Sequence, residues 1–261
     1  MSYRAIEFSV GDNGVARLTL NRPAVRNAMN GDMYDEARAV VAQVDADPRI
    51  RVLVLTGAGE GFCAGGDFRY QQSQQSRPPA ERIAEASKLA LWLRELDTLS
   101  KPLVGRINGS AHGGGIGLVA VCDVAIAVDG AEFCMTEVSR GMLPSMVSPF
   151  VVRKMGISNA RSVFLSARTF DAAQALRMGL LHEVVPAAGL DAAVGRQAGL
   201  FLRCAPGAIA ATKRLLAFVD RHEASENLDY TVRSAAEMWA TAEAAEGMQS
   251  FIEKRKPAWA R

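Results

Sequence analysis

The chain has 261 residues, of which 49% are hydrophobic and 22% are charged, and its formal net charge is +2. This composition is typical of a soluble globular protein with a sizeable core, and so small a charge argues against an extended nucleic-acid surface. No uncharged apolar run approaches the ~18 residues that a membrane-spanning helix needs. The first ten residues, MSYRAIEFSV, lack the apolar region and the cleavage site of a secretory leader. We therefore expect neither a nucleic-acid nor a membrane partner.

The four cysteines give no sign of a metal centre or a disulfide framework. Cys63, Cys122, Cys134 and Cys204 form no CxxC motif and have no metal-like spacing with the three histidines. We expect reduced, mostly buried thiols, no metal site and a cytoplasmic location.

The first part of the chain predicts a sheet with one helix. Residues 5–8 and 15–20 are expected to form a hairpin, and residues 30–44 have the apolar spacing of an amphipathic helix. Residues 52–56 (VLVLT) indicate a buried strand. The polar run at residues 68–82 (FRYQQSQQSRPPAER) predicts a mobile loop or short helix near the entrance of a site.

The middle of the chain alternates strands and helices. We expect an amphipathic helix at residues 83–99, a buried strand at 104–107 and a buried helix at 116–122. Short elements follow: strands at 124–128, 133–135 and 184–186, and helices at 149–155 with Gly156 as its cap, at 160–166 and at 171–178.

The last part of the chain has only helical patterns. From residue 190 onward these patterns are broken at residues 205–207 and near residue 221. The sequence therefore predicts an α/β protein with a core at residues 1–188 and an all-helical region at residues 189–261. No internal repeat is strong enough to be recognised.

Two loops of small residues follow buried strands. The glycine triplet 113–115 comes after the strand at 104–107, and residues 64–66 (Ala-Gly-Gly) come after the strand at 52–56. The triplet alone is equally well explained by a tight turn that lets a helix pack closely on the sheet. Together, the two loops could each supply one uncovered N–H group to a developing oxyanion. Neither loop has the pattern of a dinucleotide or phosphate fingerprint.

Five segments carry a resemblance that runs nearly from end to end. They are NRPAVRNAM (residues 21–29), GFCAGGD (61–67), NGSAHGGGIGLVAVCD (108–123), TEVSRGMLP (136–144) and FIEKRKPAW (251–259). In this order they resemble the crotonase (enoyl-CoA hydratase/isomerase) superfamily. The resemblance implies a spiral core of ββα turns and C-terminal helices that build a homotrimer, often doubled to a hexamer.

The resemblance also implies a catalytic site. The N–H groups of Gly66 and Gly114 would form the oxyanion hole for an acyl-CoA thioester, and Glu137 would be the catalytic acid/base. Glu137 is the only acidic residue between residues 133 and 150, although a surface glutamate is the alternative. The second glutamate of full-pattern hydratases is replaced here by Gly117. His112 is either an assisting group or a packed or solvent-facing side chain.

Coenzyme A is expected to bind as part of the substrate, so no separate cofactor is implied. The residues that the resemblance places against the acyl-CoA are Arg22, Arg26, Ala28, Ala64, Asp67, Arg140, Phe251 and Lys254. For Arg22 and Arg26 a solvated loop is the alternative. Phe251 and Lys254 should share one face of a helix, with Lys254 supplied by a neighbouring subunit.

The surroundings of Glu137 resemble bacterial 3-methylglutaconyl-CoA hydratases and relatives that act on isohexenylglutaconyl-CoA. This implies a hydratase acting on the 2,3 double bond of a 3-branched glutaconyl thioester. Its distal carboxylate needs a cation or several donors, for which the candidates are Arg69, Arg77, Arg140, Ser145 and Ser148.

Three other functions stay open. One glutamate also suffices for a Δ3,Δ2-enoyl-CoA isomerase, and a general short-chain enoyl-CoA hydratase is equally compatible with the site. A non-catalytic acyl-CoA-binding or RNA-binding member is disfavoured by the retained Glu137 and the near-neutral charge.

Overall fold

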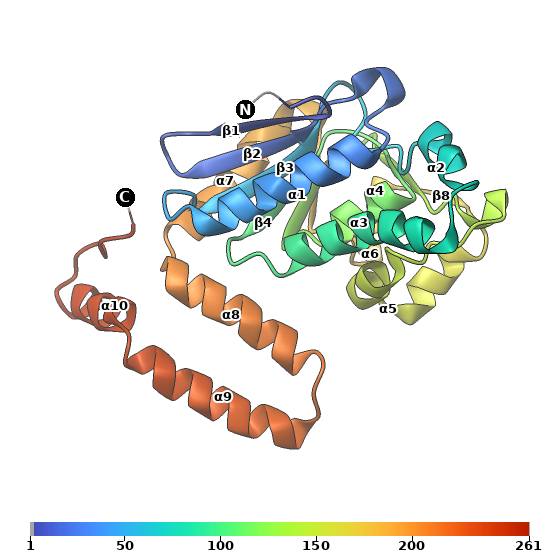
Figure 1. Cartoon of the computed structure of the whole chain (residues 1–261). Coiled ribbons are helices and arrows are strands. Elements are labelled where there is room, and N and C mark those ends of the chain that lie inside the picture. The colour runs from blue at the N-terminus through green and yellow to red at the C-terminus, as the bar shows by residue number, and fades with distance from the viewer. Residues whose placement is uncertain (1–2, 261) are drawn as a thin grey trace.

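The computed structural model describes residues 3–260. The prediction that the first ten residues are no secretory leader therefore falls in part, at Met1 and Ser2, outside the described residues, as does Arg261. Figure 1 shows a body built on a β-sheet and an arm of helices that carries the C-terminus. No helix within residues 3–260 is long and apolar enough to cross a membrane. All four cysteines are free, and only Cys204 is exposed.

The body is organised around a six-stranded sheet with the strand order β1-β2-β3-β4-β6-β9. The first pair is the predicted antiparallel hairpin, and every later pair is parallel. Its strands are β1 (Ile6–Val10), β2 (Val15–Leu20), β3 (Val52–Gly57), β4 (Leu103–Ile107), β6 (Val124–Val128) and β9 (Glu183–Val185). All residues of β3 are buried because this central strand is covered on both faces, which explains its continuous apolar sequence.

A second, three-stranded sheet has the order β5-β7-β8. Its strands are β5 (Ala111–His112), β7 (Glu132–Cys134) and β8 (Thr169–Asp171). After β4 the chain passes through β5 and α4 (Gly114–Ala120), and after β6 it passes through β7 and α5 (Ser148–Phe164). Each turn therefore places one strand in each sheet and then a helix, which is the ββα spiral that the resemblance implied.

Helices cover both faces of the large sheet. Figure 1 shows α1 (Gly31–Ala46) and α3 (Pro79–Asp97) in front of it and α7 (Leu190–Leu202) behind it. The short helices are α2 (Phe68–Gln74) and α6 (Ala172–Arg177). Of the two alternatives for residues 68–82, a mobile loop or a short helix, the structure has the helix at residues 68–74, where Asp67 caps α2 through the amides of Arg69 and Tyr70.

The predicted helices at 149–155 and 160–166 are one element, α5, with a kink. Gly156 has φ 75° and ψ 154°, which interrupts the helical backbone at the predicted position. Residues 157–159, which the sequence analysis left unassigned, continue the helix beyond it. The cap and the kink have the same cause, because only glycine adopts this backbone conformation without strain.

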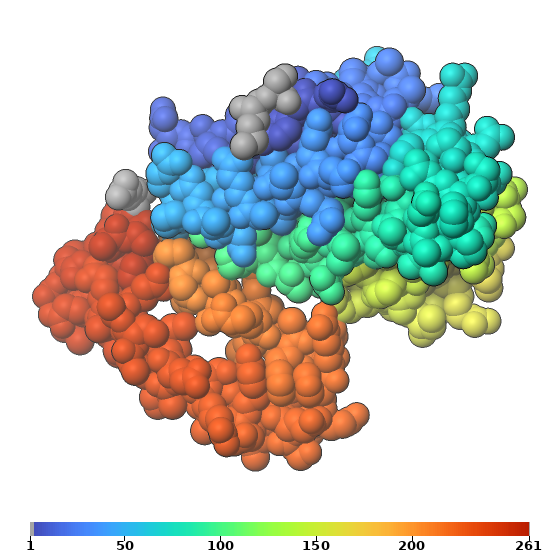
Figure 2. Space-filling model, viewed as in Figure 1, coloured from blue at the N-terminus to red at the C-terminus, as the bar shows by residue number. Residues whose placement is uncertain are grey.

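The C-terminal arm consists of α8 (Pro206–Val219), α9 (Ala224–Trp239) and α10 (Ala242–Ile252). Figure 2 shows open space between its helices. Large apolar side chains are exposed along it: Leu216, Val219, Leu228, Val232, Trp239, Met248, Phe251 and Ile252. The expectation that Phe251 and Lys254 share a helix face is wrong, because α10 ends at Ile252 and Lys254 has a left-handed φ of 54°.

Asn27 holds together the loops that lead to the glycines. It is fully buried, and its side-chain amide donates to the carbonyls of Ala58 (2.9 Å), Gly61 (2.9 Å) and Phe62 (3.2 Å). Its side-chain oxygen accepts from the amide of Arg22 at 3.0 Å. One side chain therefore pairs the polar backbone groups of two loops that have no sheet partner there.

We expect Asn27→Ala to lower the free energy of unfolding by about 3 kcal/mol or more, because several buried backbone groups lose their partner. The measurement is urea denaturation. Asn21→Ala is the matched control, since the side-chain amide of Asn21 makes one exposed hydrogen bond to Glu7. The control should cost less than about 1 kcal/mol. Equal losses for both variants would contradict the role of Asn27.

Candidate active site

The backbone amide of Gly66 points away from the segment that pairs with its loop. Met29 donates its amide to the carbonyl of Gly65 (2.8 Å) and accepts from the amide of Asp67 (2.8 Å), which forms an isolated parallel bridge. In this pattern the N–H of the middle residue faces the other side. Within residues 3–260, no backbone carbonyl accepts from Gly66, so its N–H is available to a ligand.

The amide of Gly114 is the first of α4. Gly113, just before it, has φ 48° and ψ −117°, a conformation that other residues rarely adopt. This turn is held by the amide of Gly113, which donates to the carbonyl of Cys134 at 2.9 Å. Because the first amides of a helix have no partner within it, the N–H of Gly114 is also available.

The two amides lie next to each other. A Cβ atom placed on Gly114 would lie 4.0 Å from the nitrogen of Gly66, and one placed on Gly65 would lie 3.5 Å from the nitrogen of Gly114. A second parallel bridge, between Cys63 and Ala111, brings the two loops together. Two adjacent and unpaired N–H groups are the arrangement that stabilises negative charge on a carbonyl oxygen.

Glu137 lies against the turn that leads into α4. A Cβ atom on Gly113 would be only 2.7 Å from Oε1 of Glu137, and Oε2 is buried without a hydrogen-bond partner in the described chain. Burial raises the pKa of this carboxyl, although the charge of Arg140 opposes the shift. A carboxylate with a raised pKa beside two amide donors is suited to taking and returning protons near neutral pH.

Gly117 lies one turn beyond Gly113 on α4, and its surroundings are apolar. A Cβ atom on Gly117 would overlap the side chain of Val147 and would approach Cδ1 of Leu93 at 3.4 Å. Val147 and Leu93 are both buried. The apolar side chains of Val147 and Leu93 therefore occupy the space that the side chain of a glutamate at residue 117 would need.

Arg22 contacts both Ala28 and Asp67. The guanidinium of Arg22 donates to the carbonyl of Ala28 and to the carboxylate of Asp67, the latter at 3.0 Å. Burial alone would raise the pKa of Asp67, but hydrogen bonds from the amide of Tyr70 and from Arg22 outweigh it, so that the pKa is lowered. A contact of Arg22 with CoA phosphates stays a prediction, and its charge is engaged by Asp67 here.

Arg26 and Arg140 are exposed cations near His112. Arg26 is exposed, and its carbonyl accepts from the amide of Ala64 at 2.9 Å. The guanidinium of Arg140 lies over the ring of Phe68, 4.8 Å from its centre. Burial lowers the pKa of His112, and the charges of both arginines lower it further. Two exposed cations beside a neutral histidine suit an anionic ligand.

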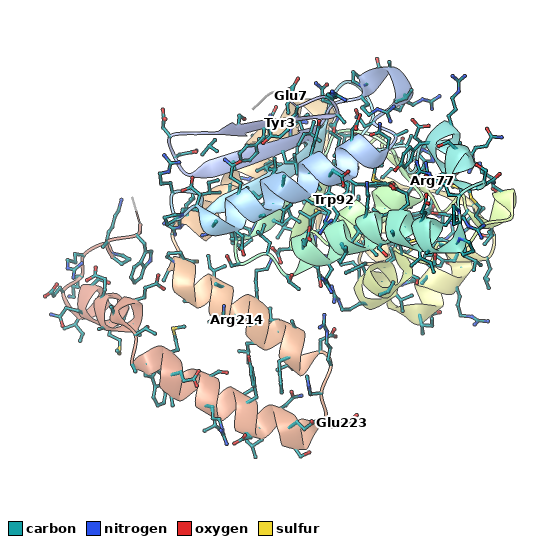
Figure 3. All side chains as sticks on the ribbon, viewed as in Figure 1. Tyr3, Glu7, Arg77, Trp92, Arg214 and Glu223 are labelled. Atoms are coloured by element: carbon teal, nitrogen blue, oxygen red, sulfur yellow. The ribbon has the colours of Figure 1, made fainter. Side chains whose placement is uncertain are left out.

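The structure does not bring every predicted residue to this site. Phe251 and Lys254 lie on the arm, at the opposite end of the chain's fold from α2 and α4 (Figure 1). Arg77 lies in the connection between α2 and α3, where it pairs with Glu81 at 3.9 Å (Figure 3). Arg69 is exposed on α2.

The two predicted serines hydrogen-bond close to their own backbone. The hydroxyl of Ser148 donates to the carbonyl of Ser145 at 2.9 Å. The hydroxyl of Ser145 lies 3.3 Å from the sulfur of Met146. Both hydroxyls therefore have a partner within three residues of their own position.

Sequence reasoning missed a cavity beside the two amides. It is lined from α1, α2 and α3, principally by Tyr34, Tyr70, Gln71, Gln74, Arg82 and Leu89. The run QQSQQ was the available signal, because residues three apart share one face of a helix. The run was interpreted only as part of a mobile loop or short helix at the site entrance, and the face shared by Gln71 and Gln74 was not considered.

Two available amides and a half-buried carboxylate at the turn between them and β7, on a ββα spiral, define a site of the crotonase class. The profile of the enoyl-CoA hydratase/isomerase family matches residues 11–261. The chain therefore belongs to this family, within the crotonase superfamily, and is an enzyme of the enoyl-CoA hydratase type.

Individual relatives agree with this assignment. The Mycobacterium tuberculosis protein named "Probable enoyl-CoA hydratase echA8" is 34% identical over 247 residues, which cover 94% of each chain. "Mevalonyl-coenzyme A hydratase sidH" of Aspergillus fumigatus is 33% identical over 93% of this chain and 90% of its own.

Solved structures show the same fold. Pseudomonas aeruginosa AtuE is 40% identical with a TM-score of 0.95, and the match covers 99% of this chain and 100% of that one. An enoyl-CoA hydratase from Shewanella pealeana is 32% identical with a TM-score of 0.94, over 98% of this chain and 96% of that one. The crotonase-type fold expected from the sequence is thereby confirmed.

We expect Gly117→Ala to destabilise the protein by about 1–3 kcal/mol, because the added methyl group overlaps Val147. Val147→Ala in the same chain should remove this penalty, so a double-mutant cycle by urea denaturation should show favourable coupling of about 1 kcal/mol or more.

Gly195→Ala in α7 is the matched control, because a Cβ atom there meets nothing within 4 Å. This substitution should stabilise the chain slightly through helix propensity. Additive effects of Gly117→Ala and Val147→Ala would show that Val147 does not close the space.

Proposed function

We propose that this enzyme adds water across the 2,3 double bond of a 3-branched glutaconyl-CoA-type thioester, either 3-methylglutaconyl-CoA or isohexenylglutaconyl-CoA. The observation that carries the proposal is the single, half-buried carboxylate of Glu137 against the turn at Gly113 that leads to the amide of Gly114, with Gly117 and Val147 in place of a second acid. This is the pattern in which the sequence resembles glutaconyl-type hydratases.

The proposed reaction assigns one task to each group. The thioester oxygen accepts hydrogen bonds from the two glycine amides, which stabilise the enolate by about 3–4 kcal/mol per donor. The carboxylate of Glu137 takes a proton from water as the water oxygen bonds to C3 and the double-bond electrons move into the enolate. Glu137 then returns that proton to C2 as the carbonyl re-forms. No cofactor is needed beyond the coenzyme A of the substrate.

Other reactions of the same site are a general short-chain enoyl-CoA hydration and a Δ3,Δ2 double-bond shift. A shift needs one carboxylate and no bound water, so the apolar wall at Val147 is compatible with it. The relatives from Mycobacterium tuberculosis and Aspergillus fumigatus are hydratases by name, and the second is named for mevalonyl-coenzyme A, which favours water addition to a functionalised acyl chain.

The exposed apolar surface of the arm supports assembly of the chain with copies of itself. Leu228, Val232 and Trp239 are exposed on α9 at spacings that place them on one face. We propose a homotrimer or a dimer of trimers, in which Phe251 and Lys254 of a neighbouring copy complete the CoA site. This would account for their distance from Glu137 within one chain.

We expect Glu137→Gln to lower the hydration rate by about 10²–10⁴-fold while leaving binding of the thioester intact, because the amide keeps the shape but cannot carry the proton. Loss of the conjugated-thioester absorbance of 3-methylglutaconyl-CoA measures hydration. The wild-type kcat should fall at low pH, as the ionised base is lost, with a midpoint above the ordinary glutamate pKa of 4.5 because burial raises that pKa.

Asp129→Asn, at an exposed turn, is the control and should leave the rate unchanged. Normal turnover by Glu137→Gln would remove Glu137 from the mechanism. Conversion of a 3-enoyl-CoA without any water addition would instead support the isomerase.

We expect Val232→Glu to shift the assembly toward monomers and to weaken CoA binding in parallel, because a charge would replace an apolar contact between copies. Analytical ultracentrifugation measures the first effect and CoA titration the second. Glu237→Lys, on another side of α9, is the control. An unchanged assembly in Val232→Glu would show that this face is not an interface.

A further inference from the structure

Several buried polar atoms without partners gather in one cavity between α1, α2 and α3. The cavity has a volume of about 140 Å³. Oε1 of Gln71 and Oε1 of Gln74 are both buried, and neither has a hydrogen-bond partner in the described chain. The hydroxyl of Tyr34, which is 5% exposed, has no hydrogen bond with any residue between 3 and 260. Native proteins pair almost all buried polar atoms, so such a cluster indicates a place for a ligand.

The cavity begins at the two amide donors. A Cβ atom on Gly66 would overlap the side-chain amide of Gln71, and one on Gly114 would lie 3.6 Å from Cδ2 of Leu89. Gln71 and Leu89 both line the cavity. An acyl chain whose thioester oxygen lies at these amides can therefore extend into it.

Neighbouring structure holds the lining residues in place. Tyr34 packs edge-on against Trp92, with ring centres 6.2 Å apart. The side-chain nitrogen of Gln74 donates to the carbonyl of Tyr70 (3.1 Å) and to the hydroxyl of Ser73 (2.8 Å), while its side-chain oxygen has no partner in the described chain. These contacts make the cavity a preformed site rather than a gap between mobile side chains.

Two charged side chains, Arg82 and Glu85, line the cavity. Arg82 lines it and has no ion pair with any residue in the described part of the chain. The carboxylate of Glu85 accepts from the hydroxyl of Tyr70 and shares Lys88 with Asp35, at 3.5 Å from Glu85 and 2.9 Å from Asp35. An entering anion would find a free guanidinium, whereas an entering cation would compete with Lys88 for Glu85.

The volume sets the length of chain that fits. A protein cavity of about 150 Å³ accommodates a molecule the size of benzene, or about six non-hydrogen atoms. A carboxylate, the methylene next to it, the C3 carbon and a methyl branch make up about that number. Met146 lines both this cavity and a larger groove with Leu91 and Phe150, so a longer branch at C3 has a separate path.

We propose that Tyr34, Gln71 and Arg82 hold the distal carboxylate of the acyl chain in this cavity. The inference rests on the proposed function, and it replaces Arg69, Arg77 and Arg140 as the recognition group for that carboxylate. The hydroxyl of Tyr34 and the amide nitrogen of Gln71, after rotation of its end by half a turn, donate to the carboxylate. Arg82 supplies the compensating charge at the cavity's exposed end.

The test is binding of three saturated thioesters to the full-length protein by isothermal titration calorimetry. Glutaryl-CoA carries the carboxylate, 5-methylhexanoyl-CoA is its apolar equivalent in shape, and 5-hydroxypentanoyl-CoA carries a neutral hydroxyl. The wild-type protein should bind glutaryl-CoA about 10- to 100-fold more tightly than the apolar thioester, as expected for hydrogen bonds to a charged group.

Tyr34→Phe and Arg82→Gln should each weaken glutaryl-CoA binding about tenfold and leave 5-methylhexanoyl-CoA within about twofold. Both variants keep most of the original shape, so folding is preserved. Arg69→Gln is the matched control, because Arg69 is exposed on α2 and does not line the cavity, and it should change neither affinity.

Equal affinity of the wild-type protein for glutaryl-CoA and 5-methylhexanoyl-CoA would overturn the proposal. A 5-hydroxypentanoyl-CoA affinity equal to or tighter than that of glutaryl-CoA would also overturn it. That result would mean that the cavity binds a neutral hydroxyl, which donates to the side-chain oxygen of Gln74. Saturated thioesters cannot be hydrated, so these results do not depend on the proposed reaction. If the protein prefers glutaryl-CoA but does not hydrate 3-methylglutaconyl-CoA, the carboxylate site is supported and the proposed hydratase activity is contradicted.

Discussion

The close approach of two loops at Gly66 and Gly114 is the constraint on which the site depends. Two isolated bridges, Met29 with Gly66 and Cys63 with Ala111, hold these loops where no regular strand pairing exists. The approach needs glycine at residue 65, because its φ is +90° and a Cβ atom there would lie 2.8 Å from the carbonyl oxygen of His112. The backbone, and not any side chain, thereby supplies the two donors, and it does so without reorganisation when a ligand enters.

Around these donors the site is strongly asymmetric. The carboxyl of Glu137 is buried on one side, and burial raises its pKa because no described residue pairs with its inner oxygen. One turn further along α4, Val147 fills the space beside Gly117. A single proton-carrying group against a hydrocarbon wall limits the chemistry to what one carboxylate can do, so the acyl chain must be distinguished elsewhere, beyond Gln71.

The body and the arm contribute in different ways. The body contains the amides, Glu137 and the cavity, all held by a sheet whose central strand is completely buried. The arm exposes large apolar side chains along α9 and α10, which is costly for a chain that remains alone in water. The C-terminal motif that includes Phe251 lies on this arm, so its part in the site depends on how copies of the chain associate.

The sequence by itself determined the features that arise locally: the buried strands, the glycine loops, the interruption of helical backbone at Gly156 and the absence of a second acid at residue 117. These follow from backbone conformation and from apolar periodicity, which neighbouring residues largely decide. Only the tertiary structure decided what polar side chains contact. Arg22 pairs with Asp67, 45 residues away, and Tyr34 and Gln71 meet in one cavity from different helices. Such contacts depend on long-range packing, and the spacing of polar residues along a chain carries little information about that packing.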